Sequence, residues 1–475
     1  MDRITEDVDL LVVGGGKAGK TLAMDWARSG RRVAMVERGM IGGTCINVAC
    51  IPTKALVASA RAVRVLARAR ELGLVAEAPS ADAAVAPPAD AELAPLVSTE
   101  LLRAHKNGVV QGMIAINHKQ FLESGMDFVL GQARFIAERT VEVALNDGDT
   151  RVLRGADTVI NTGTEPRIPD IPGLREAGFL TSETLLGLER LPARLIVIGG
   201  GPIGLEFADM FAAFGSQVTL LVRGPRLLPY EDEDIAEAVT GLLTAHGVDI
   251  RTDSQVASVR SDGDQRVVTL TDGTYVTGDE VLVAVGRRPV TAELDLDAGG
   301  VRTTDASFVA VDEHLATNVP HTWAAGDVAG SWQFTHVSLD DYRILKANLA
   351  GGSRSTRDRL IPHTTFLTLD FARVGLTETQ ARAAGYEVGV AKLPVTAIPR
   401  ARTMRDTDGI WKAVVDTRTD RILGVALLGP ESGETLAAVQ IAMLADLPYT
   451  SLRDMILTHP TMTEGLNLLF AALQR

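Results

Sequence analysis

Cys45 and Cys50 are the only two cysteines among the 475 residues, and they lie five positions apart. Cysteines this close can form a structural disulfide, half of a metal site or a redox couple. A disulfide that closes so short a loop removes little chain entropy, so it adds little stability. A metal site normally needs further Cys or His ligands nearby, and His118 is among the closest of eight histidines. The redox interpretation is therefore favoured, and the other two stay open.

The turn between the two cysteines is predicted to be irregular. Residues i and i+5 of an ideal helix have Cα atoms about 8.6 Å apart, whereas a disulfide needs about 4.4–6.8 Å. If the sulfurs bond, the segment between them cannot be regular helix. Pro52 agrees with this, because proline is tolerated in the first turn of a helix and disfavoured deeper. We expect a distorted turn and then a helix through Lys54 towards Ala69, and a bond held in such a turn is easier to open.

A glycine-rich loop precedes the cysteine motif. The apolar segment 8–13 indicates a buried parallel strand, and it leads into Gly14-Gly15-Gly16-Lys17-Ala18-Gly19, which contains the pattern G-x-G-x-x-G. A helix and a second strand ending at Glu37 complete a βαβ unit. Gly14, Gly16 and Gly19 let the backbone approach a pyrophosphate at a helix N-terminus, and Glu37 can accept hydrogen bonds from ribose hydroxyls. Because the cysteines follow directly, the bound dinucleotide is expected near the sulfurs.

The same pattern returns at Gly199-Gly200-Gly201-Pro202-Ile203-Gly204, between a predicted strand and a predicted helix. Two fingerprints imply two dinucleotide sites, and Gly199, Gly201 and Gly204 would hold the second nucleotide. At the position equivalent to Glu37 the chain has Val222, with Arg223 and Arg226 beyond it. An acid there favours a free ribose 2′-hydroxyl, and arginines in its place favour a 2′-phosphate. We therefore predict NADPH rather than NADH at the second site, and two solvated surface arginines are the alternative.

The remaining segments complete an α/β pattern. Segment 77–95, dominated by Ala, Pro and Asp, is expected to be a solvated surface excursion without function. A helix over 101–121 should precede antiparallel strands with a hairpin turn at 146–148 and a separate strand over 157–161. A later strand runs into Gly326-Asp327, which places a carboxylate where α/β proteins bind ligands, with a plain turn as the alternative. From about residue 356 an antiparallel sheet is expected, with strands over 366–369, 374–375, 387–393, 411–415 and 422–428 and helices over 434–445 and 451–455.

Composition limits the class of protein. A chain of 475 residues is too long for one core, so roughly two to four domains are expected. The net charge of −13 argues against a nucleic-acid partner. Acidic residues stand where a signal peptide would be basic, and no apolar stretch approaches the ~18 residues of a membrane span. We expect a cytoplasmic enzyme without membrane contact, a setting in which close cysteines are more often catalytic than structural.

Together the motifs resemble the flavoprotein disulfide reductases, the group of glutathione reductase, dihydrolipoamide dehydrogenase and mercuric reductase. The resemblance covers essentially the whole chain: a fingerprint, Gly-Gly-Thr-Cys-x4-Cys-x-Pro-Thr-Lys, a second fingerprint, Ala-Gly-Asp and a terminal His-Pro-Thr-x-x-Glu. Within the group the chain is most similar to the bacterial reactive-chlorine-resistance branch, whose members are described as reducing hypothiocyanous acid or copper(II). The segments that carry this similarity are 16–22, 338–343 and 397–402.

The resemblance implies two cofactors and four parts of the chain. FAD would lie on Gly14, Gly16, Gly19 and Glu37, with Asp327 at its ribityl end, and the second fingerprint would hold NADPH, or NADH as the alternative. Further cofactor-binding candidates are Gly43, Thr44, Gly163, Gly286 and Gly326, and no metal ligand is assigned. The expected domains are 1–164 for FAD and the redox-active disulfide, 165–289 for NAD(P)H, 290–355 completing the FAD domain, and 356–475 for dimerisation. The expected fold class is thus α/β, with two Rossmann-like domains and an α+β dimerisation domain.

The resemblance also implies catalytic roles. Cys50 would be the charge-transfer thiol beside the flavin, and Cys45 the interchange thiol that meets substrate. Lys54 would lie near flavin N5, paired with Glu206; a plain surface cation is the alternative. His459 would be the acid/base that acts across a dimer interface on the partner's Cys45, and Glu464 would fix its tautomer. A helix-capping or core histidine is the alternative for His459.

We therefore predict a homodimeric, FAD-dependent NAD(P)H oxidoreductase that passes electrons through a Cys45–Cys50 disulfide to a disulfide or small oxidant. The chain ends without the cysteine pair of mercuric reductases, and Val222 stands where dihydrolipoamide dehydrogenases usually have an acid. A dihydrolipoamide dehydrogenase serving a larger complex remains one alternative. A flavin-binding redox sensor that does not turn over is another. The terminal oxidant is not identified by any motif.

Overall fold

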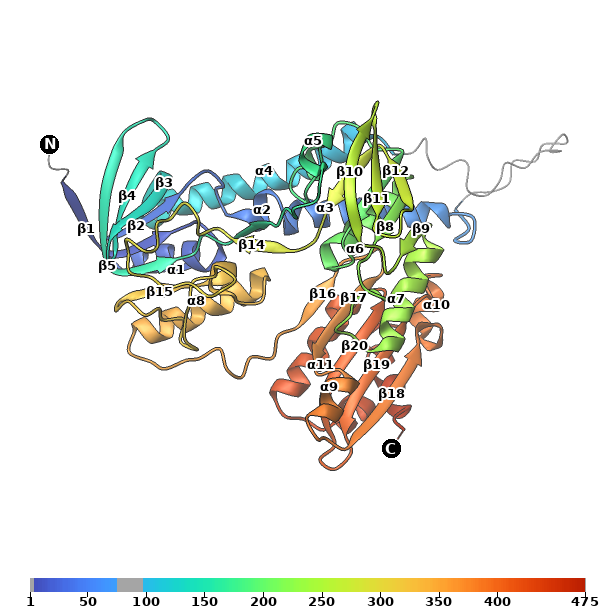
Figure 1. The fold of residues 1–475 in the computed structure, drawn as a ribbon. Coiled ribbons are helices and arrows are strands. Elements are labelled where there is room, and N and C mark those ends of the chain that lie inside the picture. The colour runs from blue at the N-terminus through green and yellow to red at the C-terminus, as the bar shows by residue number, and fades with distance from the viewer. Residues whose placement is uncertain (1–3, 75–96, 475) are drawn as a thin grey trace. The chain divides into compact units, whose positions relative to one another are not determined.

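The computed structural model describes residues 4–74 and 97–474 (Figure 1), so the predicted surface excursion at 77–95 lies outside the described residues. The chain divides into two compact units. The first unit takes Met1–Thr53, Ala104–Arg167 and Gly286–Arg359. The second takes Lys54–Arg103, Ile168–Val285 and Leu360–Arg475.

A six-stranded sheet is the framework of the first unit. Its order is β1-β2-β3-β4-β5-β15, and β5 also pairs with β1. Leu10, Leu11 and Val12 of β1 have no exposed surface, as expected of a strand in the parallel part of the sheet. A two-stranded ribbon of β6 and β14 belongs to the same unit. The bounds are β1 (Thr5–Val13), β2 (Val33–Glu37), β3 (Asp127–Ala137), β4 (Thr140–Leu145), β5 (Thr150–Ile160), β6 (Thr164–Pro166), β14 (Arg287–Pro289) and β15 (Thr322–Ala324).

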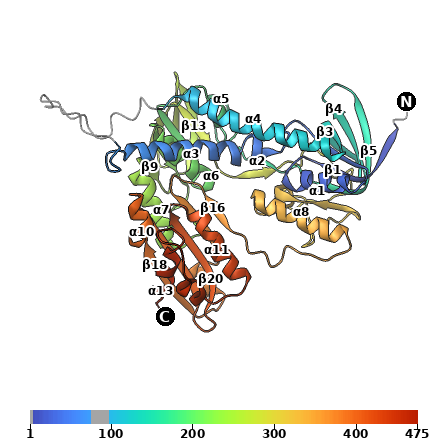
Figure 2. The same cartoon turned by 180° about the vertical axis from the view of Figure 1, so that it is seen from behind.

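Two helices of the first unit, α1 (Lys17–Arg28) and α8 (Thr335–Leu349), pack side by side against this sheet (Figures 1 and 2). Leu22 of α1 and Ile344 of α8 share one apolar cluster with Leu10 of β1. Because β1 leads into α1, this packing fixes the glycine loop between them. The other helical elements that begin or lie in this unit are α2 (Thr44–Asn47), α3 (Cys50–Ala67), α4 (Thr99–Ser124) and η3 (Gly326–Ala329).

The second unit contains a parallel sheet of order β13-β7-β8-β9 and a three-stranded antiparallel sheet of β10, β11 and β12. β7 and β8 pair in parallel and α6 connects them, so the predicted second βαβ frame is confirmed. Ile196 and Val197 of β7 are at most 1% exposed. The bounds are α5 (Leu174–Ala177), η2 (Leu185–Gly187), β7 (Arg194–Ile198), α6 (Pro202–Ala213), β8 (Gln217–Leu221), α7 (Glu233–Ala245), β9 (Val248–Arg251), β10 (Val256–Asp262), β11 (Gln265–Leu270), β12 (Tyr275–Gly278) and β13 (Glu280–Val283).

A five-stranded antiparallel sheet of order β16-β17-β20-β19-β18 forms the C-terminal part of the second unit. Its core surrounds the fully buried Trp411, and α11 packs on β17 and β20. The bounds are β16 (His363–Thr365), β17 (Asp370–Gly375), α9 (Glu378–Ala383), β18 (Val388–Pro394), η4 (Val395–Ala397), α10 (Pro399–Thr403), β19 (Ile410–Asp416), β20 (Arg421–Gly429), α11 (Ser432–Leu444), α12 (Tyr449–Asp454) and α13 (Gly465–Ala471).

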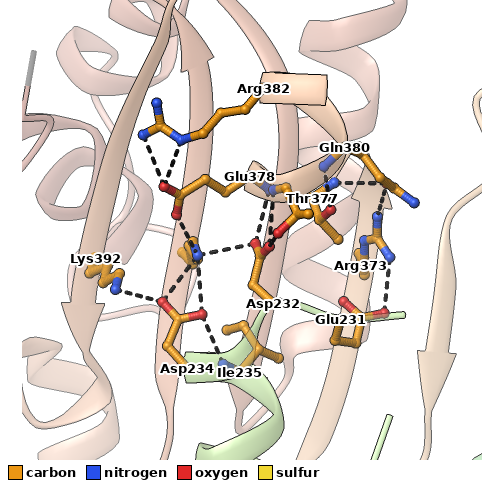
Figure 3. A network of polar contacts seen from close by, with 12 residues as sticks. Glu231, Asp232, Asp234, Ile235, Arg373, Thr377, Glu378, Gln380, Arg382 and Lys392 are labelled. Atoms are coloured by element: carbon orange, nitrogen blue, oxygen red, sulfur yellow. Dashed lines mark hydrogen bonds and ion pairs between the residues drawn. The ribbon is translucent and has the colours of Figure 1, made fainter. Parts of the chain in front are cut away.

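A buried lysine, Lys412 of β19, connects this sheet to the start of α7. Figure 3 labels its partners Asp232, Asp234 and Glu378. Its Nζ lies 3.0 Å from Asp232, 3.0 Å from Asp234 and 2.9 Å from Glu378, and its side chain is 3% exposed. Burial opposes ionisation of Asp232, but the amides of Glu378 and Thr379 and then Lys412 lower the pKa of this carboxyl below its usual value. The cluster is therefore charged at neutral pH.

Two strand predictions were wrong in detail. Segment 366–369 is not a strand, because its amides bind carboxylates instead of a neighbouring strand: Phe366 N donates to Glu206 at 2.9 Å and Thr368 N to Asp209 at 2.6 Å. The strand at this place is β16, which ends at Thr365. Segment 157–161 is not a separate strand but the end of β5, because β1 pairs with β5 along its length from Thr5↔Val152 to Val13↔Ile160.

The expectation about apolar length also needs correction. The helical stretch Thr44–Ala67 is long and apolar enough to cross a membrane by length and composition alone. Its cations Lys54, Arg61 and Arg64 pair with carboxylates that are at most 8% exposed. Because its cations pair with buried carboxylates of the same protein, this stretch is explained as a helix of the protein's own fold.

Candidate active site

The two thiols lie at the junction of α2 and α3. Between them Val48 has φ −141° and ψ 14°, which is not helical, so the predicted irregular turn is confirmed. Pro52 lies in the first turn of α3, as expected. Cys45 and Cys50 are both partly buried, and no disulfide joins them in the described part of the chain. Cys50 Sγ lies 3.5 Å from Thr335 Oγ1.

The two sulfurs influence each other's ionisation. The hydrogen bond with Cys50 and then burial raise the pKa of the Cys45 thiol, whereas Thr335 and Lys20 act to lower it. The two sulfurs therefore titrate as a coupled pair in which Cys45 resists the loss of its proton. Cys45 needs a separate base before it can attack a substrate as a thiolate.

Thr335 reaches the sulfurs because it is the first residue of α8. A helix N-terminus carries a partial positive charge, which favours thiolates. One turn further, Ser338 Oγ accepts a hydrogen bond from Ala18 N at 3.2 Å, and Tyr342 OH donates to Asp25 at 3.3 Å. Segment 338–343, one of the three stretches that carry the branch resemblance, thus fixes α8 against α1.

The first glycine loop closes tightly around Asn161. Gly14 has φ +101°, and a Cβ there would lie 2.5 Å from Asn161 O; a Cβ on Gly16 would lie 2.5 Å from Asn161 Oδ1. Gly19 N donates to the same Oδ1 at 2.9 Å. Gly14 and Gly16 therefore have no room for a side chain. Asn161 is a site residue that the sequence did not reveal.

Glu37 holds the loop from the other side. It is 8% exposed, and its Oε2 accepts from Gly15 N at 2.8 Å while Oε1 accepts from Gly39 N and Met40 N at 2.9 Å each. Oε1 uses both of its lone pairs in these contacts, whereas Oε2 keeps one for a ribose hydroxyl. The carboxylate thus also has a structural role that the sequence did not suggest.

The first unit fits the pyrophosphate of a dinucleotide. Ala18 N and Gly19 N are used by Ser338 and Asn161, but among the described residues no acceptor binds the amides of Gly16 and Lys17 at the start of α1. Free amides at a helix N-terminus bind phosphate oxygens. FAD is therefore compatible with the donors that this loop presents.

The cysteine motif packs against the glycine loop, as expected because the two segments are close in sequence. Gly43 has φ +80°, and a Cβ there would lie 3.1 Å from Gly15 O. Thr44 follows as the first residue of α2. Gly43 and Thr44 thus lie where a dinucleotide on the glycine loop would pass, so their assignment as cofactor-binding residues stays a prediction with suitable geometry.

Asp327 lies at the start of η3, directly after β15. Burial raises the pKa of Asp327, although Thr164 donates to its Oδ2 at 2.7 Å and Arg287 lies near it. Gly326 N donates to Asp341 at 2.6 Å, and this second buried carboxylate is neutralised by Arg359. The Ala-Gly-Asp turn is therefore held by α8, and the part of Gly326 and Asp327 in cofactor binding stays a prediction.

Two further predicted glycines, Gly163 and Gly286, precede the strands of the β6–β14 ribbon. They have φ +73° and +116°. Gly163 O accepts from Val290 N, and Gly286 O accepts from Arg167 N, each at 3.0 Å. These contacts give both glycines a turn-forming role, and their part in cofactor binding stays a prediction.

The second fingerprint has the same close packing in the second unit. Gly199 has φ +119°, and a Cβ on Gly204 would lie 1.9 Å from Gly199 O. Gly201 is the N-cap of α6 and has open space around its Cα. The loop can therefore receive the phosphates of a second dinucleotide at the start of α6.

The residues that would discriminate between NADPH and NADH differ from one another in exposure and in contacts. Val222 is 7% exposed and packs on Gly200. Arg226 Nη2 donates to Pro229 O and Glu231 O at 3.0 and 3.1 Å, which commits this end of the guanidinium to the backbone. Arg223 is exposed and is thus the better candidate for a 2′-phosphate.

Lys54 and Glu206 form the predicted pair within the second unit. Lys54 Nζ lies 2.9 Å from Oε1 and 2.7 Å from Oε2 of Glu206, and it lies 4.9 Å from the centre of the Phe366 ring. Glu206 is buried and also accepts from Phe366 N. The pairing is confirmed, so Lys54 is not a free surface cation, and its place near a flavin stays a prediction.

His459 and Glu464 also form the predicted pair. Nδ1 of His459 lies 2.9 Å from Oε2 of Glu464, and the His459 side chain is 70% exposed whereas that of Glu464 is 13% exposed. This histidine is therefore neither buried in the core nor capping its own helix. Its ring presents Nε2 to the surroundings while the carboxylate fixes the tautomer.

The chain has close relatives along its whole length. Residues 8–341 match the family described as "Pyridine nucleotide-disulphide oxidoreductase", and residues 361–469 match its dimerisation domain. The probable pyridine nucleotide-disulfide oxidoreductase RclA of Escherichia coli (strain K12) is 40% identical over 469 residues, which cover 97% of this chain and 98% of that protein. Mercuric reductase of Streptomyces lividans is 36% identical over 466 residues, with coverages of 97% and 95%.

Solved structures agree with these matches. The copper(II) complex of the HOCl-induced flavoprotein disulfide reductase RclA from Escherichia coli superposes with a TM-score of 0.89 at 39% identity, covering 98% of this chain and 99% of that one. LpdA from Mycobacterium tuberculosis superposes with a TM-score of 0.87 at 25% identity and the same coverages. The predicted fold class is thereby confirmed.

Proposed function

Because this chain belongs to the pyridine nucleotide-disulfide oxidoreductase family, we propose that it passes electrons from NADPH through Cys45 and Cys50 to a small sulfur, halogen or metal oxidant. It is an oxidoreductase that uses FAD and NAD(P)H. The observation that carries the proposal is the cysteine pair beside Thr335, which packs on a glycine loop that fits a dinucleotide. We place this activity in the cytoplasm, where thiols are kept reduced.

FAD would lie on Gly14, Gly16, Gly19 and Glu37, with Asp327 towards its ribityl end. When bound, this cofactor accepts a hydride from the nicotinamide and passes an electron pair to the cysteine pair. The protein's part is to hold Cys50 beside Thr335 at the N-terminus of α8, an environment that favours a thiolate. Lys54, braced by Glu206, would supply positive charge that favours a reduced, anionic ring.

Cys45 would be the thiol that meets the oxidant. The raised pKa of the Cys45 thiol means that it keeps its proton at neutral pH, so it needs a base. His459, oriented by Glu464, has a suitable residue type and exposure. With hypothiocyanous acid as oxidant, the dithiol would become a disulfide while thiocyanate, water and one proton leave.

A homodimer would bring His459 of one subunit to the cysteines of the other. The chain carries the family's dimerisation domain, and large apolar side chains remain exposed on it: Ile441 at 65%, Leu444 at 67% and Ile456 at 100%. Exposed apolar groups of this size favour a protein contact. In such a dimer, His459 of one subunit would act on Cys45 of the other.

Hypothiocyanous acid and copper(II) are our first candidates for the oxidant, because RclA of Escherichia coli is similar over the whole chain and has been crystallised with copper(II). Two copper(II) ions would each take one electron from the dithiol, releasing two protons. Dihydrolipoamide oxidation, the alternative that the family resemblance raises, is the second candidate.

The test is NADPH consumption with hypothiocyanous acid, copper(II), glutathione disulfide, lipoamide and mercury(II) as acceptors. Turnover that disappears in Cys45→Ser supports the dithiol route. NADH-driven turnover restricted to lipoamide would identify a dihydrolipoamide dehydrogenase. Slow flavin reduction with no acceptor consumed, and no effect of His459→Ala, would indicate the sensor and refute the proposal.

A further inference from the structure

Lys20 is a buried lysine next to the site that the proposed function leaves without a role. It follows Gly19 in α1, and it is 5% exposed. Its Nζ donates to Gly42 O at 2.9 Å and to Asn117 Oδ1 at 2.8 Å. Among residues 4–74 and 97–474, no carboxylate forms an ion pair with it. Two neutral oxygens are thus its hydrogen-bond acceptors.

A buried ammonium group without a carboxylate is costly, because neither water nor an opposite charge compensates it. Burial first, and then Lys17, lowers the pKa of Lys20 to about 8, while Cys45 acts in the opposite direction. At pH 7 most of the molecules therefore still carry the charge. The cation is available when an anion forms close by.

The carbonyl that Lys20 holds belongs to the segment that leads into Cys45. A Cβ on Gly42 would lie 2.8 Å from Ile46 Cδ1 and 3.5 Å from Asn117 Cγ, so the segment is enclosed between α2 and α4. Cys45 and Lys20 act electrostatically on each other. The other groups that act on this pair are Lys17, Cys50 and Thr335.

We propose that Lys20 is a positioning residue for the dithiol: its buried charge stabilises the anionic form of Cys45, and its ammonium group holds the Gly42 carbonyl. This inference rests on the proposed function, in which the Cys45 thiolate attacks the oxidant. Each time His459 or another base removes the Cys45 proton, the new negative charge would form near a fixed cation instead of in an uncompensated site.

The experiment uses FAD-loaded protein in a Cys50→Ser background, so that Cys45 titrates alone. Alkylation of Cys45 by iodoacetamide is followed by mass spectrometry between pH 6 and 10, without NADPH or acceptor. Lys20→Met should move the midpoint of the alkylation profile upward by about one pH unit and slow alkylation at pH 7.5 about tenfold. Asn117→Asp keeps the lysine but gives its ammonium group a carboxylate partner. This variant should also move the midpoint upward, by a smaller amount.

Lys119→Met is the matched control, because Lys119 is a 75% exposed lysine of the same helix as Asn117, and its profile should not move. A profile unchanged in both Lys20→Met and Asn117→Asp would overturn the proposal. So would loss of FAD from Lys20→Met without any change of the thiol midpoint, since Lys20 would then serve a phosphate. Alkylation needs no turnover. If the wild type were inactive and Lys20→Met still moved the alkylation midpoint, the proposed function would be refuted and the role of Lys20 would stand.

Discussion

Oε2 of Glu464 lies 2.9 Å from Nδ1 of His459, while the other carboxylate oxygen, Oε1, is buried without a partner among the described residues. The pair is built so that a buried acceptor orients an exposed ring. Such an arrangement suits a histidine that serves a group outside its own fold.

Substitutions of this pair should separate orientation from proton transfer. His459→Ala should lower kcat by about 10²–10³-fold, and Glu464→Gln by about tenfold, because a glutamine still reaches the ring but fixes its tautomer less strictly. Steady-state NADPH consumption with the acceptor found in the screen measures both. An unchanged kcat in His459→Ala would remove this residue from the mechanism.

Asn161 should be needed for flavin retention. Its amide oxygen accepts from Gly19 N and its nitrogen donates to Ala325 O at 2.5 Å, so it joins the glycine loop to the strand end before Asp327. Asn161→Ala should lower the FAD content of purified protein several-fold, measured as flavin absorbance per chain. Asn318→Ala, an exposed asparagine of the same unit, should keep its full FAD content, and equal retention in both variants would contradict this role.

Nucleotide preference should depend on Arg223 more than on Arg226. Arg223→Ala should lower kcat/KM for NADPH about tenfold and leave kcat/KM for NADH nearly unchanged, since only the 2′-phosphate contact would be lost. The measurement is the ratio of kcat/KM values for the two nucleotides. A wild type that already prefers NADH tenfold would show that the absence of an acid at Val222 was misinterpreted.

Lys412 should matter for stability and not for electron transfer. Lys412→Met would leave Asp232, Asp234 and Glu378 without their shared cation and should cost about 3–5 kcal/mol of unfolding free energy at pH 7. Lys392→Met, which removes a 48% exposed lysine from Asp234, should cost less than about 1 kcal/mol. Denaturant unfolding measures both values, and equal costs would show that burial of Lys412 is unimportant.

The same cluster gives a pH dependence with a defined sign. The folded protein holds the pKa values of Asp232, Asp234 and Glu378 below their ordinary range. Their contribution to stability is therefore present above about pH 4 and is lost as the pH falls through the lowered values. Because burial without Lys412 favours the neutral acids, the difference between wild type and Lys412→Met should shrink on acidification. A difference that grew instead would refute this account.

The sequence predicted best the features that depend on neighbours along the chain. The irregular turn between Cys45 and Cys50 follows from spacing, and the glycines of both loops follow from the need for close backbone approach. The His459–Glu464 pair lies five residues apart, within reach of local reasoning. These features need no knowledge of which distant segments meet.

The missed residues are those whose partners are distant in sequence. Thr335 lies 285 positions from Cys50, and Asn161 lies 142 positions from Gly19. A single threonine or asparagine carries no periodicity that would predict such a meeting. Segment 366–369 failed for a related reason, because an apolar run that indicates a strand gives its amides to Glu206 and Asp209 instead.

The first two turns of α8 set a limit on how this protein can change. Thr335, Ser338 and Asp341 follow one another at intervals of three residues and each holds a different element: Cys50, the start of α1 and the Ala-Gly-Asp turn. One inserted residue between them would rotate the later contacts by about 100° around the helix axis. Insertions and deletions between Thr335 and Asp341 should therefore not be tolerated, and this constraint applies to any engineered or natural variant.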